Sequence, residues 1–188
     1  WSPEGAETTA GSKVMIDNPS GEVDAMVAAE VVGSARDYQN KVLAFTHPTT
    51  QLIFKVVADG TLDSGTTVNS ITVKDARIPD GFSLAEGGAV VTYADAADLA
   101  VPGIAGEIIP SGGLVVGRPV MIEPFSGNKM SLDVVTSGAE FRNVVVTIDE
   151  DADFQPGKAY EITLTFRQSE VVLKASVAPW DYSGSGAA

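Results

Sequence analysis

The chain has 188 residues, a formal net charge of −13 at pH 7, no cysteine and one histidine, His47. The absence of cysteine excludes disulfides and thiolate chemistry, and a single histidine excludes a histidine-rich metal site. The acidic balance argues against binding to nucleic acid or to an anionic membrane, because both require a basic patch. The hydrophobic content of 44% is above that of a disordered chain, and the length suffices for one large domain or two small ones.

The N-terminal part carries few regular signals. Residues 1–22 are rich in Pro, Gly, Ser and Thr, which is typical of a linker or a loop. Residues 23–32 fit either a short strand or about two turns of helix, since Ala and Met favour helix and the paired valines favour strand. The sequence shows no signal peptide and no run of about 18 apolar residues, so we expect no transmembrane helix and a start that is mature or trimmed.

Short alternating stretches dominate from Lys41 to Trp180. Leu52, Phe54 and Val56 alternate with other side chains at the period of two that a strand requires. Further strands are predicted at 68–74, 89–93, 120–122, 131–135 and 141–148, and one helical turn is predicted at 94–99. Turn signals recur every ~8–12 residues, and about eight strands in this arrangement predict an all-β sandwich or barrel.

The clearest element is a β-hairpin over residues 154–180. Its first strand places Tyr160, Ile162, Leu164 and Phe166 on one face and polar residues on the other. Residues 167–170 turn the chain. The alternation then continues through the second strand, with the apolar positions Val171, Leu173, Ala175 and Val177. Pro179 ends the second strand because it lacks the N–H that a ladder needs.

The motifs that carry chemistry are weak in this sequence. The acidic run Asp149, Glu150, Asp151 and Asp153 lacks the spacing of a calcium loop, so we interpret it as a solvated loop. His47 lies beside a predicted strand without a second ligand, which favours a structural role. No phosphate-binding loop and no Gly-x-Ser-x-Gly elbow occur, and we therefore predict that the chain is not an enzyme and needs no cofactor or metal.

Two segments resemble one known family. Leu43–Val56 (LAFTHPTTQLIFKV) and Phe154–Trp180 (Pro-Gly-Lys, an aromatic-led strand, a turn, a second strand, then Pro-Trp) are similar in order and spacing to Bacteroidales fimbrillin-like proteins, the major and minor fimbrium subunits and related cell-surface adhesins. The chain departs from the family pattern at Pro48, where an alanine is expected. The resemblance implies a transthyretin-like β-sandwich with Greek-key-type connections, as the second of two tandem sandwich domains, in a protein exported to the outer membrane as a lipoprotein.

The resemblance also implies how the chain is divided and how it works. Residues 1–36 would be a linker or the remnant of a preceding domain, 37–182 the C-terminal sandwich and 183–188 a flexible tail. The implied function is that of a structural subunit of a fimbrium or adhesin, which assembles by β-strand exchange with other subunits or itself. The candidate strand-exchange residues are Leu52, Phe54, Val56, Val171, Leu173 and Val177.

The sequence also fits an alternative function. A surface β-sandwich that never polymerises would instead bind a glycan or another ligand of the host or of a bacterial surface. Exposed aromatic side chains would mark such a site, and the candidates are Tyr38, Tyr93 and Tyr182.

Overall fold

The protein is represented by a computed structural model, which describes residues 13–31, 42–85, 88–148, 153–168 and 170–180. Throughout these ranges the regular structure is β-strand, and they include no helix long and apolar enough to cross a membrane. The strands are β1 (Lys13–Met15), β2 (Val27–Ala28), β3 (Phe45–Thr46), β4 (Thr50–Ala58), β5 (Thr67–Ala76), β6 (Pro79–Ala85), β7 (Gly88–Tyr93), β8 (Ala97–Ala100), β9 (Glu107–Ile108), β10 (Leu114–Ile122), β11 (Lys129–Thr136), β12 (Glu140–Thr147), β13 (Ala159–Phe166) and β14 (Val171–Ala178).

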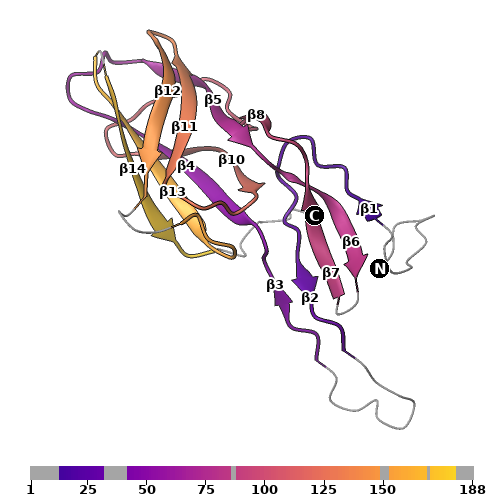
Figure 1. The fold of residues 1–188 in the computed structure, drawn as a ribbon. Helices are drawn as coiled ribbons and strands as arrows, with labels where there is room; N and C mark the ends of the chain where they lie inside the picture. The colour runs from indigo at the N-terminus through magenta and orange to yellow at the C-terminus, as the bar shows by residue number, and fades with distance from the viewer. Residues whose placement is uncertain (1–12, 32–41, 86–87, 149–152, 169, 181–188) are drawn as a thin grey trace, which may run out of the picture.

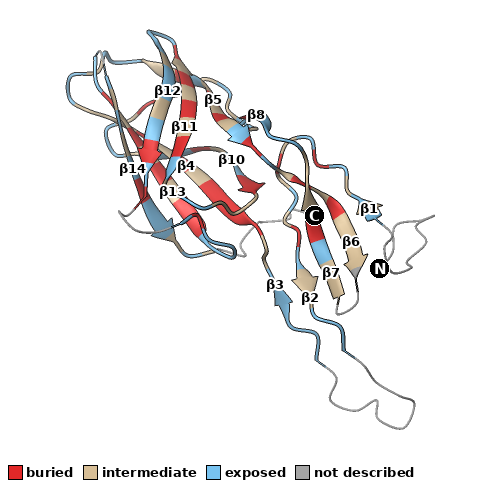
Figure 2. Ribbon diagram, viewed as in Figure 1, coloured by how far each residue is buried: buried red, intermediate tan, exposed pale blue. Residues whose placement is uncertain are grey.

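Two sheets form a sandwich. One has the strand order β10-β4-β13-β14, and the other has the order β12-β11-β5-β8 with β9 also paired to β5. Figure 2 shows that the buried residues gather on the strands of this sandwich, above all on β4, β11 and β13. The all-β prediction is therefore confirmed, whereas the transthyretin-like topology stays a prediction.

The core forms because the alternation in each strand points one set of apolar side chains at the opposite sheet. On β13, Ile162, Leu164 and Phe166 are fully buried, and on β11 Leu132 and Val134 are fully buried. Each such side chain contributes roughly 1.5–3 kcal/mol on burial. The residues predicted to alternate in β4 and β13 thus supply the centre of the core.

The predicted hairpin is present as β13 and β14, which pair without a register shift from Ala159–Ala178 to Phe166–Val171. On its other side β13 pairs in parallel with β4, from Ala159–Gln51 to Phe166–Ala58. A parallel pair needs a long crossover connection, and here the crossover contains every strand of the second sheet.

A smaller layer extends from one end of the sandwich, as Figure 1 shows. It contains the sheet β1-β6-β7 and the ribbon β2-β3, and a bridge between Ala29 and Gly88 links the two. Both β1 and β2 precede residue 36, so residues from the predicted linker pair with strands later in the chain. The division into domains at residues 36 and 182 stays a prediction, and residues 183–188 lie outside the described ranges.

Three sequence predictions differ from the structure. The prediction of a helical turn at 94–99 is wrong, because Ala97–Ala100 forms the strand β8 and pairs with β5. The described residues from Phe45 to Ala178 form twelve strands where about eight were predicted, because the prediction missed β6 and the short strands β8 and β9. Val177 was placed on the buried face of its strand but is 58% exposed, although its partner Tyr160 on β13 is buried, because β14 is the edge strand of its sheet.

Candidate functional site

The strand β14 is an edge of its sheet. It pairs with β13 along its whole length, and no other described strand pairs with its outer side. The edge strand β12 of the facing sheet lies close to β14 without hydrogen-bonding to it. Where these two edge strands approach each other, Phe141 of β12 packs edge to face against Phe166 of β13, with ring centroids 6.0 Å apart. Aromatic side chains therefore pack between the two sheets at this edge, while the outer side of β14 pairs with no described strand.

The predicted strand-exchange residues fall in two different settings. Leu52, Phe54 and Val56 are at most 1% exposed and lie on β4, whose backbone is paired with β10 on one side and β13 on the other. Val171 and Leu173 are half-buried on the edge strand β14. The two groups thus flank the same strand, β13, but β14 has an open side and β4 has none.

His47 joins three distant parts of the chain. Its Nδ1 lies 2.9 Å from Oδ1 of Asp24, and its ring packs against Trp180 with centroids 4.3 Å apart and an interplanar angle of 32°. The residue therefore connects the N-terminal segment, the start of β4 and the end of the chain after β14. Within the described ranges no group of three or more His, Cys, Asp or Glu side chains has the spacing to hold a metal ion.

The other residues predicted as functional candidates are only partly described. Tyr93 is half-buried, and its hydroxyl donates to the backbone oxygen of Pro48 at 3.1 Å. Burial, with the nearby Glu123 carboxylate, raises the pKa of Tyr93 to about 12. Asp153 is exposed and accepts a hydrogen bond from the Gly127 amide at 2.8 Å. The other candidates, Tyr38, Tyr182, Asp149, Glu150 and Asp151, lie outside the described residues.

A cavity of about 490 Å³ lies where β5 and β11 separate. The ladder between these strands ends at the pair Leu132–Val73, and the next residues of the two strands line the cavity without pairing with each other. Asp75 has a φ of 52°, and the register of β5 against β8 shifts around it. A positive φ is uncommon for any residue except glycine, and such a bulge bends a strand away from its neighbour. The gap therefore follows from a local distortion of β5.

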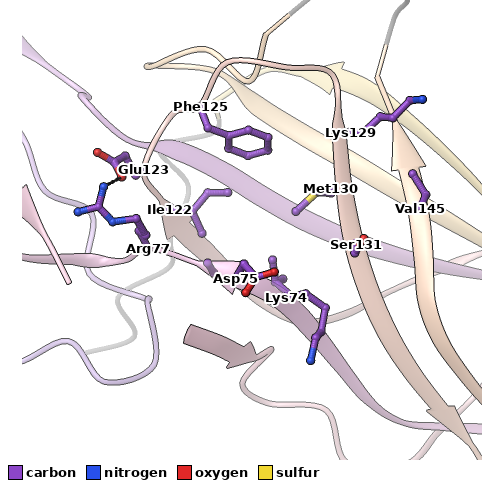
Figure 3. A pocket seen from close by; sticks show the side chains of 12 residues that line it. Lys74, Asp75, Arg77, Ile122, Glu123, Phe125, Lys129, Met130, Ser131 and Val145 are labelled. Carbon is purple, nitrogen blue, oxygen red and sulfur yellow. Dashed lines mark hydrogen bonds and ion pairs between the residues drawn. The ribbon is translucent and has the colours of Figure 1, made fainter. Parts of the chain in front are cut away.

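The inner part of the cavity is apolar. Val73, Ile122 and Met130 are buried there, and Phe125 stacks on Phe154 with ring centroids 4.5 Å apart. Figure 3 shows Phe125, Ile122 and Met130 around the cavity, with Lys74 and Asp75 on the β5 side.

Charged side chains surround the opening. Arg77 Nη1 lies 2.5 Å from Glu123 Oε2, and the Glu123 amide donates to the Arg77 carbonyl at 2.7 Å. Lys74 donates to the Asp98 carboxylate, and this hydrogen bond is the main reason that the pKa of Lys74 lies above its ordinary value. These pairs hold the polar atoms of the rim in fixed positions. No sequence motif marks this site, because its residues come from four strands and from the segments that follow β5 and β10.

A model of the fimbrillin-like family matches residues 1–180 of the chain. The chain belongs to the fimbrillin-like family. A search of curated proteins gave no match.

Three solved structures are similar to the chain, and one of them has a TM-score above 0.5. A Bacteroides uniformis protein, provisionally described as a cell adhesion protein, is 22% identical with a TM-score of 0.58, and the alignment covers 93% of this chain and 69% of that one. A Bacteroides vulgatus fimbrial protein is 12% identical with a TM-score of 0.43, covering 74% of this chain and 56% of that one. The tip fimbrial protein Mfa3 of Porphyromonas gingivalis is 10% identical with a TM-score of 0.43, covering 72% of this chain and 52% of that one. The chain thus spans little more than half of the two fimbrial relatives, and the first comparison shows a shared fold.

Proposed function

We propose that this fimbrillin-like chain is a structural subunit of a fimbrium or a related cell-surface adhesin. It acts through contacts with other subunits or with copies of itself and carries out no catalysis. Family membership supports this role, and the all-β body is consistent with it. A location at the cell surface follows from the same role.

Assembly proceeds by strand exchange at the open side of β14. The observation that carries this proposal is an edge strand of eight residues with no bulge, in a sheet whose inner strands β4 and β13 each have a partner on both sides. A long, regular edge presents unpaired N–H and C=O groups, and an added strand gains main-chain hydrogen bonds there. Among the predicted strand-exchange residues, Val171, Leu173 and Val177 lie on β14, where an added strand would pair. Those on β4 instead support the core beneath it.

The test uses charge on the exposed side chains of β14. Val172 and Val177 are 39% and 58% exposed, so replacing both with Lys should leave the core intact and repel an incoming strand. The matched control is Val115→Lys, because Val115 is 51% exposed on β10, the opposite edge of the same sheet. Size-exclusion chromatography and electron microscopy across concentration, with and without protease, measure polymer formation.

The expected result is that wild type and Val115→Lys form polymers and the Val172→Lys, Val177→Lys double variant remains monomeric with an unchanged circular dichroism spectrum. A folded double variant that polymerises as wild type does would exclude β14 as the assembly strand. A wild-type chain that stays monomeric under every condition would favour the non-polymerising, ligand-binding alternative.

A further inference from the structure

We propose that the cavity between β5 and β11, formed by a gap in the sheet above the Phe125–Phe154 stack, is a binding site for a neutral saccharide. The site is separate from the β14 edge, so this inference does not depend on strand exchange. It rests on the shape, the charge and the lining of the cavity.

The shape of the cavity favours a compact ligand. At one end the β5–β11 ladder closes at Leu132–Val73, and at the other end the Glu123 amide bonds to the Arg77 carbonyl. An extended peptide that pairs with a strand edge must enter and leave along the strand direction, and both exits are blocked. The volume of about 490 Å³ lies within the range of small-molecule sites. The gap therefore suits a short, closed molecule better than a strand of another chain.

The charge around the cavity favours a neutral ligand. Three cations, Lys74, Arg77 and Lys129, and two anions, Asp75 and Glu123, line it. Two of the cations are already neutralised, since Arg77 pairs with Glu123 and Lys74 pairs with carboxylates outside the lining. A phosphate or sulfate needs a surplus of positive charge, which neither this rim nor the net charge of −13 provides.

The lining combines one apolar side with hydrogen-bonding groups. The ring of Phe125 is braced from behind by Phe154, and the face of an aromatic ring carries the negative side of its quadrupole. The C–H face of a sugar ring is weakly positive and is therefore attracted to the face of the Phe125 ring. Among the described residues the side chains of Lys129 and Ser131 make no hydrogen bond or ion pair, so they are available as donors to hydroxyl oxygens. The carboxylates of Asp75 and Glu123 accept hydrogen bonds from hydroxyl groups.

The experiment titrates neutral methyl glycosides of glucose, galactose, mannose and N-acetylglucosamine into the 188-residue chain. Saturation-transfer NMR detects binding. A glycan array then distinguishes host glycans from bacterial polysaccharides as the source of the sugar. The variants are Lys129→Ala with Ser131→Ala on the rim and Phe125→Leu on the apolar side. Lys174→Ala is the matched control, because Lys174 is exposed on β14 away from the cavity.

We expect at least one neutral saccharide to bind, about tenfold more weakly in the rim double variant and in Phe125→Leu, and unchanged in Lys174→Ala. Suppose that Phe125→Leu loses binding but has an altered circular dichroism spectrum, while the folded rim double variant binds as wild type does. This result would count against the site, because the only loss of binding would then come from a misfolded variant. Binding that no cavity variant weakens would also overturn the proposal. So would the absence of binding on both the glycoside panel and the array. Rim-dependent binding of uronic acids or of short peptides in place of neutral sugars would overturn the assigned ligand class.

Discussion

The ammonium nitrogen of Lys13 lies 2.8 Å from the Asp80 carboxylate, and this ion pair joins β1 to β6. Thr92 of β7 donates a second hydrogen bond to the same carboxylate at 2.6 Å. One side chain thus ties together all three strands of the layer beside the sandwich. Both bonds favour the ionised form, the bond from Lys13 most strongly, so the pKa of Asp80 lies below its ordinary value.

The stability of this layer should therefore depend on pH through Asp80. A carboxylate with a depressed pKa stabilises the folded state above its unfolded-state pKa of about 3.9, and the contribution is lost as the pH falls through the folded-state pKa. Asp80→Asn should lower the free energy of unfolding at pH 7 by no more than about 1 kcal/mol, because the Lys13 and Asp80 side chains are 42% and 23% exposed.

The measurement is urea denaturation of wild type and Asp80→Asn at several pH values. The difference between them should shrink as the pH is lowered from about 5 towards 2, because the carboxyl group then protonates in both states. A difference that stays constant over this range would show that Asp80 acts only through shape and neutral hydrogen bonds.

The central strand β13 should dominate the stability of the sandwich. Leu164 is fully buried between the two sheets, and its removal leaves a cavity where β4 and β14 flank the strand. Leu164→Ala should lower the free energy of unfolding by about 2–5 kcal/mol. The adjacent Thr163 points to the opposite face and is only half-buried, so Thr163→Ala should cost less than about 1 kcal/mol. Chemical denaturation of both variants measures the contrast, and equal losses would contradict the assigned faces.

The hairpin β13–β14 and the inward residues of β4 could be predicted because each depends on a local alternation of period two. The parallel pairing of Gln51 with Ala159 could not, since nothing local specifies which distant strand a buried strand will meet. In β8 the Ala-rich sequence favours helix, but pairing of Ala97–Ala100 with β5 overrides that preference. The cavity was unpredictable for a similar reason: it depends on a positive φ at Asp75, which is not a glycine.

The bulge in β10 should require its glycine. Gly117 has a φ of 67° at the point where the register of β10 against β4 shifts. A Cβ there would lie 2.7 Å from Val101 Cγ1 and 2.9 Å from the carbonyl oxygen of Pro102. Because the second neighbour is backbone and the φ is positive, Gly117→Ala should lower the free energy of unfolding by more than about 1 kcal/mol. The matched control is Gly112→Ala, since a Cβ at Gly112 meets no atom within 4 Å. Thermal unfolding should show a lower midpoint for Gly117→Ala alone, and equal midpoints for the two variants would mean that the bulge tolerates a side chain.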